Sequence, residues 1–176
     1  MRLAELEIEL GGAGESEIFF NRKSTGTAED GRLAAQVEAP RGDNLVLANA
    51  VNLAGHVSIG DWAILGGMTP VHQFVRIGRG AIIGAVTMVT NDVIPYGLVQ
   101  APRGELDGLN LVGLKRRGVS RADITALRAA FQMLAQGEGT FHDRAERLQH
   151  ETSSDYVREI VDFVLSDSDR HFLTPR

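Results

Sequence analysis

Residues 47–93 read LANAVNLAGHVSIGDWAILGGMTPVHQFVRIGRGAIIGAVTMVTNDV, and this stretch repeats with a period of six. Small or branched aliphatic residues open every hexad without a slip: Leu47, Leu53, Ile59, Leu65, Val71, Ile77, Ile83 and Val89. The next position is mostly tiny, and the position four after the aliphatic is small or β-branched. A helix needs a period near 3.6 and an ordinary strand a period of 2, so neither explains the repeat.

Hexapeptide repeats are typical of a parallel β-helix, in which three short strands form one coil and stacked coils share an apolar core. We therefore predict a mainly β fold, a left-handed parallel β-helix with a carboxy-terminal α-helical cap. The aliphatic side chains are expected to point into the core. The small residue beside each aliphatic is expected to let the backbone turn the corner.

The repeat divides the chain into four expected segments. Residues 1–41 do not keep the period and are interpreted as an irregular or degenerate amino-terminal segment, and residues 42–95 as the β-helix. Residues 96–119, rich in glycine, are expected to be a linker, and residues 120–176 a helical domain that opens with a capping box at Ser120 and Asp123. Eight hexads form less than three coils, which bury little core and expose strand edges at their ends. Flanking segments or partner chains must cover these ends, so an oligomer is expected.

Composition narrows the functional classes. Hydrophobic residues make up 43% of the chain and there is no cysteine, which excludes disulfides and thiolate metal sites. We see no secretion signal and no apolar run of membrane-spanning length, so a cytoplasmic protein without membrane insertion is expected. The net charge of −5 argues against nucleic-acid binding. The stretch from Arg76 to Arg121 is nevertheless basic, which suits a phosphate-bearing or acidic partner, although a solvated basic face explains it equally well.

Two histidines interrupt the β-helix. The separation between His56 and His72 is close to the three hexads of one coil, so they are expected to lie near each other on adjacent coils. His72 replaces the tiny residue of its hexad, which predicts an outward side chain, and Gln73 beside it adds donors and acceptors. Ordinary surface polarity is the alternative. The other three histidines lie in the tail, so no metal site is predicted.

A second polar cluster, Lys115-Arg116-Arg117, directly precedes the helix expected at Ser120. Arginine binds phosphate through two parallel hydrogen bonds and stacks on planar bases. The cluster therefore suits a nucleotide diphosphate or a phosphopantetheine arm.

The segments LANAVNLAGHVSIGDWAILGGMTPVHQFVRIGRGAIIG, DVIPYGLV and GLNLVGLKRRGVSR resemble the carboxy-terminal part of the UDP-N-acetylglucosamine acyltransferases of lipid A biosynthesis. The resemblance implies a homotrimer with active sites between neighbouring β-helices and no cofactor. It also implies transfer of a 3-hydroxyacyl chain from acyl carrier protein to the 3-hydroxyl of UDP-N-acetylglucosamine.

The resemblance also implies roles for individual residues. Its sugar-nucleotide contacts fall on His56, His72, Gln73, Asn110 and Arg116. The surface that receives the carrier protein includes Arg117, with Arg76 and Arg79. Ala85 falls where side-chain size limits acyl length, so a groove shortened by about one or two methylenes is expected, each worth ~0.8 kcal/mol of burial.

One departure from the family concerns catalysis. The family carries, about a hexad before LANA, a motif of the form HxxHDC whose second histidine is the general base. Ungapped alignment puts Ala34 at the first histidine, Val37 at the base and Glu38 at the orienting aspartate, and no histidine precedes His56. A carboxylate with a pKa near ~4.3 is a weak substitute for that base. The amino terminus is therefore interpreted as truncated or frame-disrupted.

Three hypotheses follow. The first is an acyltransferase of this family, and the second is a trimeric remnant that binds ligands but lacks the base. The third is another hexapeptide enzyme that uses acetyl-coenzyme A, which the combination of AGHV, VHQF and GLKRRG disfavours.

Overall fold

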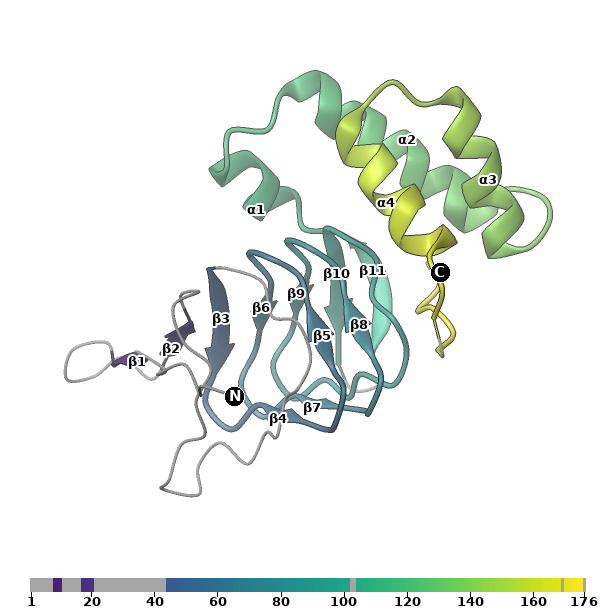
Figure 1. Ribbon diagram of the computed structural model, residues 1–176. Coiled ribbons are helices and arrows are strands. Elements are labelled where there is room, and N and C mark those ends of the chain that lie inside the picture. Colours follow the sequence, from purple (N-terminus) through teal and green to yellow (C-terminus); the bar gives the residue numbers. More distant parts are fainter. Residues whose placement is uncertain (1–7, 11–16, 21–43, 102–103, 169, 176) are drawn as a thin grey trace, which may run out of the picture.

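The computed structural model describes residues 8–10, 17–20, 44–101, 104–168 and 170–175 (Figure 1). The strands are β1 (Ile8–Leu10), β2 (Glu17–Phe20), β3 (Leu45–Ala48), β4 (Asn52–Leu53), β5 (Ser58–Ile59), β6 (Ile64–Leu65), β7 (Pro70–Val71), β8 (Arg76–Ile77), β9 (Ile82–Ile83), β10 (Gly97–Gln100) and β11 (Glu105–Leu109). The helices are α1 (Leu111–Arg116), α2 (Arg121–Gln136), α3 (Phe141–Glu151) and α4 (Asp155–Leu165).

The strands of residues 45–93 stack in parallel on three sides of a coil. Strand β3 pairs with β6 and β6 with β9, in a register that joins Val46 to Ile64 and Ile64 to Ile82. The second side pairs β4 with β7, and the third pairs β5 with β8. Each of these pairings advances three hexads along the chain. The predicted parallel coils of hexapeptide repeats are thus present, and Figure 1 shows them stacked beneath the helices.

The interior of the coil holds the residues that the period predicted. Every aliphatic residue that opens a hexad is at most 9% exposed. The residue four positions later is also buried in most hexads, including Val57, Ala63, Thr69 and Thr87. Two inward side chains per hexad explain why both positions must be apolar or β-branched.

The corners are made by a different residue than the one predicted. Residues with a left-handed backbone, φ between 58° and 63°, stand three positions after every hexad aliphatic except Val89, as at His56, Trp62 and Phe74. Most of these are not glycine, although that conformation costs about 1–2 kcal/mol for other residues. Their backbone N–H groups donate to the coil before, as Phe74 N does to the Gly55 carbonyl at 3.0 Å. These regular bonds offset part of the cost.

The small residue after each aliphatic has another role. A Cβ atom built on Gly60 would lie 2.6 Å from the backbone nitrogen of Arg79, and one on Gly66 would lie 2.4 Å from that of Ala85. The next coil therefore passes directly over this position. The hexad needs small residues there because two backbones approach closely, and the turn itself follows later in the hexad.

The segment 96–119, expected to be a linker, is structured. Strand β10 pairs in parallel with β9 and antiparallel with β11, and α1 follows at once. Val99, Leu106 and Leu114 are at most 1% exposed. The hairpin thus covers the open strand edge of the last coil, which glycine content alone did not reveal. At the other end of the same sheet, β3 pairs antiparallel with β2, and β2 with β1.

The helical cap forms as the sequence predicts. Ser120 Oγ accepts a hydrogen bond from Asp123 N at 3.0 Å at the start of α2, and Gly137 ends that helix. Ile124, Leu127 and Leu134 are buried on one face of α2, against which α3 and α4 pack. Among the described residues, no helix combines the length and apolar character that crossing a membrane requires.

The residues after α4 return to the coil and lie beside its last strands (Figure 1). We call residues 166–168 and 170–175 the tail strap. Asp92 N donates to the His171 carbonyl at 2.8 Å, and Leu173 N donates to the Asp92 carbonyl at 2.8 Å. Single bridges also pair Asp92 with Phe172 and Leu106 with Pro175. The strap therefore connects the helical cap to the β-helix.

Candidate functional site

The two coil histidines lie on turns that stack on one another. The first turn runs over 54–57 and the second over 72–75, and Ala54 N donates to the Val71 carbonyl at 3.0 Å. A full coil takes three hexads, so the residue directly over His56 is Phe74 and not His72. Their rings stack with centroids 4.8 Å apart and planes inclined by 17°. The predicted adjacency of the two turns is present, and Phe74 is an aromatic neighbour that the sequence did not point out.

His72 and Gln73 are exposed, as their outward position predicts. The Nδ1 atom of His72 contacts the guanidinium of Arg170, from the tail strap. The Nε atom of the same arginine donates to the Gln73 carbonyl at 3.0 Å. Sequence reasoning missed Arg170, because nothing in the repeat indicates that residues so far apart in the chain meet.

Asn110 is buried, with 5% of its surface exposed, and caps the amino terminus of α1. Its Oδ1 accepts from Gly113 N at 2.9 Å, and its Nδ2 donates to the Gly80 carbonyl at 3.0 Å. A Cβ atom on Gly113 would lie 2.5 Å from this amide. The side chain predicted as a nucleotide contact therefore connects α1 to the last full coil.

The basic cluster of α1 divides into an exposed and a half-buried arginine. Arg116 is exposed in the last turn of the helix, where it is available to a ligand. Arg117 is half-buried, and burial lowers the pKa of its guanidinium below the usual value. Its Nη2 atom is buried against Gly80 and has no hydrogen-bond partner among the described residues. Arg117 is therefore only partly available at the surface.

The other two predicted carrier-protein contacts differ sharply. Arg79 has 48% of its side chain exposed, 3.9 Å from the carboxylate of Glu159 on α4. Glu159 also accepts a hydrogen bond from the Tyr96 hydroxyl, and burial together with this carboxylate raises the pKa of Tyr96. Arg79 thus lies where the coil meets the helical cap.

Arg76, also predicted to meet the carrier protein, makes several contacts within the chain. Its Nε donates to Asp92 Oδ2 at 2.6 Å, and its Nη1 donates to Ser166 Oγ at 2.7 Å. The guanidinium also lies over the ring of Phe163, 4.6 Å from its centroid. These contacts hold the Arg76 side chain against Asp92, Ser166 and Phe163 of the same chain. The register explains the pairing, because Ile77 bridges to Val93 before three full hexads are complete, which brings Asp92 beside Arg76.

Ala85 lies exposed at a corner of the coil that is unusually apolar. We define the apolar edge as Met68, Val86 and Met88, which are 61%, 59% and 44% exposed. Met68 and Val86 belong to stacked corners, since Val86 N donates to the Gly67 carbonyl at 2.8 Å. The predicted acyl-length position therefore adjoins exposed apolar surface.

Ala34, Val37 and Glu38, the positions aligned with the family's catalytic motif, lie outside the described residues. In the part of the chain that is described, no three His, Cys, Asp or Glu side chains are placed to hold a metal ion.

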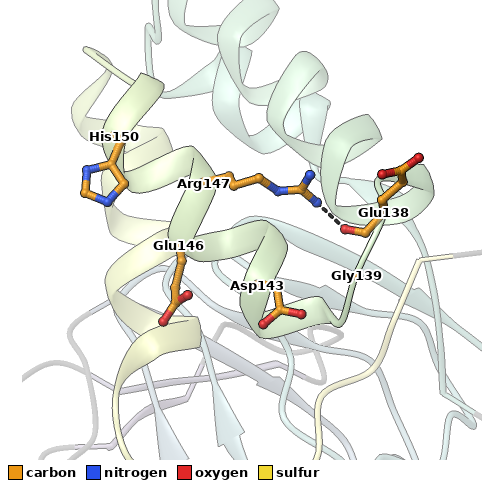
Figure 2. Close-up of a pocket in the computed structure, with 6 residues that line it drawn as sticks. All are labelled: Glu138, Gly139, Asp143, Glu146, Arg147 and His150. Carbon is orange, nitrogen blue, oxygen red and sulfur yellow. Dashed lines mark hydrogen bonds between the residues drawn. The ribbon is translucent and has the colours of Figure 1, made fainter.

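A hollow of about 490 Å³ in the helical cap lies far from these residues along the chain. Figure 2 shows that its polar side chains point in different directions. Asp143 is engaged in the capping box of α3, and Arg147 donates to the Glu138 carbonyl. These contacts stabilise the end of α2 and the start of α3, and they do not converge on a ligand.

Comparison with known proteins adds the family. Residues 92–173 match the family described as "Udp N-acetylglucosamine O-acyltransferase; Domain 2". The acyl-[acyl-carrier-protein]–UDP-N-acetylglucosamine O-acyltransferase of Paracoccus denitrificans is 60% identical over 135 residues, which are 76% of this chain and 51% of that protein.

Solved structures agree with this assignment. The UDP-N-acetylglucosamine acyltransferase from Campylobacter jejuni superposes with a TM-score of 0.72 and 34% identity, over 78% of this chain and 54% of its own. The Arabidopsis UDP-N-acetylglucosamine acyltransferase gives 0.70 and 32%, over 77% and 50%. This chain spans about half the length of the relatives it matches. Residues 92–173 therefore match the second domain of the UDP-N-acetylglucosamine O-acyltransferases, and about three quarters of this chain is similar to them.

Proposed function

We propose that this chain acts on UDP-N-acetylglucosamine and acyl carrier protein, transferring a 3-hydroxyacyl chain to the sugar 3-hydroxyl in the first step of lipid A biosynthesis. The 60% identity to a relative with this name carries the proposal. The stacked turns with His56 and His72, and the exposed Arg116 of α1, support it. We further propose that the coils are left-handed, as the family resemblance implies.

In this proposal the polar turns hold the sugar nucleotide. His56, His72 and Gln73 supply hydrogen-bond donors and acceptors at one exposed corner of the coil. The exposed Arg116 contributes a permanent positive charge for the diphosphate. Asn110 acts by fixing the start of α1, and so the place of Arg116, through its two hydrogen bonds.

The apolar edge is proposed to hold the acyl chain. Alkyl groups are stabilised by about 0.8 kcal/mol for each methylene removed from water, and Met68 and Val86 offer such surface beside Ala85. Arg79 is the predicted carrier-protein contact that remains largely exposed. A carrier protein would meet it at the junction of the coil and the cap.

We propose a homotrimer, because the apolar edge is too exposed for a single chain and a groove between two coils would enclose the acyl chain. The proposed transfer needs a general base, and no histidine precedes His56 in the sequence to match the base of the family. A trimer that binds the sugar nucleotide without turnover is accordingly the second candidate function.

The test combines affinity, turnover and mass for the purified chain of 176 residues. Calorimetry should show UDP-N-acetylglucosamine binding that weakens roughly tenfold or more in His56→Ala and Arg116→Ala, since each loses a hydrogen bond or charge. Arg128→Ala, an exposed arginine of α2, is the matched control and should not change the affinity.

Acyl transfer from 3-hydroxyacyl carrier protein then separates the two candidates. Turnover supports the transferase, with Glu38 the first residue to replace. Binding by a trimer without turnover supports the remnant. A chain that shows no binding of the sugar nucleotide and no turnover would contradict both candidate functions.

A further inference from the structure

The tail strap places one charged side chain directly on the predicted sugar-nucleotide turn. Arg170 is half-buried and contacts the turn over 72–75 at two points. Its Nε donates to the Gln73 carbonyl at 3.0 Å, and its Nη2 meets the Nδ1 atom of His72. The contact with the Gln73 carbonyl fixes the guanidinium on the backbone of the turn, and the second contact directs one of its donors at the imidazole.

The strap holds Arg170 from both sides. Before it, Ser168 Oγ donates to the buried Asp92 carboxylate at 2.5 Å and accepts from Arg170 N at 3.1 Å. After it, the His171 carbonyl accepts from Asp92 N at 2.8 Å. Asp92 is fully buried and is itself fixed by Arg76. The guanidinium is therefore presented by an ordered backbone anchored in the last coil.

The chemistry of the contact favours one tautomer of the neutral imidazole. A guanidinium carries five N–H donors and no acceptor, so the atom that it meets must supply a lone pair. Nδ1 of His72 must then be unprotonated, and the proton of the neutral ring resides on Nε2. The Gln73 carbonyl lies 3.3 Å from Nδ1 and would otherwise attract a proton to that atom. Arg170 opposes this, because its Nη2–H donor occupies the lone pair of Nδ1.

We propose that Arg170 is a positioning residue that holds His72 as the Nε2–H tautomer. The Nε2–H group of His72 is then the donor that faces the ligand. The ligand part rests on the proposed function, and there the partner of Nε2–H is an acceptor oxygen of the sugar nucleotide. The tautomer part depends only on the two contacts of Arg170. The tail thereby joins the binding site, although it lies far from His72 in the sequence.

The direct test is ¹⁵N NMR of the histidine side chains in the full chain at a pH where His72 is neutral. His72→Asn identifies the signals of His72 by their loss. In the parent we expect Nδ1 to resonate as an unprotonated nitrogen and Nε2 as a protonated one. In Arg170→Gln the two forms should mix, because the Gln73 carbonyl again competes for a proton on Nδ1. Arg170→Lys, which keeps a donor, should restore part of the parent spectrum.

Affinity for UDP-N-acetylglucosamine is the second readout. Arg170→Gln should weaken binding roughly fivefold to tenfold, the value of one hydrogen bond. In a His72→Ala background the same change should have no further effect, since the arginine acts through that ring. Arg128→Ala, with the same loss of charge, should leave both the tautomer and the affinity as in the parent.

The outcomes are distinct. A His72 tautomer that does not respond to Arg170→Gln overturns the inference, whatever the affinity. A tautomer that responds while affinity is unchanged overturns the ligand role. If the parent itself binds no sugar nucleotide, the proposed function fails, and the spectra still decide the role of Arg170.

Discussion

In each hexad, the small residue that follows the aliphatic one is the position where adding a methyl group should destabilise the fold most. At Gly60 a Cβ atom would lie 2.6 Å from the backbone nitrogen of Arg79, and 2.9 Å from its Cα. Backbone atoms of a stacked coil cannot rotate away as a side chain would. The coils must separate, or their hydrogen bonds, such as Gly60 N to the Ile77 carbonyl at 2.8 Å, must lengthen.

We expect Gly60→Ala to lower the free energy of unfolding by about 1–3 kcal/mol, the usual cost of overpacking. Gly55→Ala is the matched control, because nothing lies within 4 Å of a Cβ built there. It should be neutral or slightly stabilising, by up to about 1 kcal/mol, because alanine restricts the unfolded chain. Urea denaturation of both variants measures the difference, and equal effects would contradict this account of the repeat.

The buried ion pair is the second feature at the residue scale. Asp92 has a side chain with no exposed surface, and that of Arg76 is 19% exposed. Asp92→Asn keeps the shape and removes the charge, so the guanidinium is left without its counter-ion. We expect a loss of about 3–5 kcal/mol in the free energy of unfolding, as for other broken buried pairs.

The exposed pair of Asp155 and Arg158 provides the control for that prediction. Both side chains are at least half exposed, and such pairs contribute about 0–1 kcal/mol. Asp155→Asn should therefore change the urea midpoint little. A comparable loss in the two variants would mean that burial does not strengthen the Asp92 contact.

At the scale of elements, the sequence predicted the features that local patterns encode and missed those that depend on distant contacts. The core positions and the cap of α2 followed from period and capping chemistry, and both are observed. The left-handed corners escaped because residues such as Trp62 and Phe74 have no preference for that conformation. The hairpin of β10 and β11 was not predicted, because the glycines within it suggested a linker. The contacts of Arg170 and Arg76 join distant segments of the chain, which no local pattern encodes.

The junction of the last coil with α4 gives a prediction on pH. Burial and Glu159 raise the native pKa of Tyr96 above its ordinary value of 10.0. A raised native pKa means that the neutral hydroxyl stabilises the fold fully below pH 10, and that this contribution is lost as pH rises beyond it. Tyr96→Phe removes this contribution at every pH.

The parent should therefore be more stable than Tyr96→Phe near pH 8, and the gap should narrow as the pH passes 10. Urea denaturation between pH 8 and pH 11 measures both curves. Tyr156→Phe on α4 is the comparison, because no hydroxyl hydrogen bond of Tyr156 is among those the structure gives for the described residues. A constant gap for Tyr96→Phe would mean that the hydroxyl is not what couples the coil to the cap.

At the scale of the whole molecule, antiparallel strands extend the main sheet at both ends, whereas the apolar edge is left uncovered by the described chain. Strands β1 and β2 extend the main sheet at one end, and β10 and β11 extend it at the other. Met68 and Val86 remain about 60% exposed on stacked corners, without a segment of the described chain over them. Self-association through this edge would remove that surface from water, at about 1.5–3 kcal/mol for each side chain fully buried.

We therefore expect Met68→Lys to raise the dissociation constant of the proposed homotrimer by at least about tenfold, since a charge cannot be buried there unpaired. Thr125→Lys, at an exposed position of α2, adds the same charge away from the edge and should leave association unchanged. Analytical ultracentrifugation over a range of concentrations measures both. Loss of the trimer in Met68→Lys alone would place the interface on the apolar edge, beside Ala85 and the proposed acyl site. An unchanged trimer in both variants would move the interface to another face of the coil, and the acyl chain could then not lie between subunits at this edge.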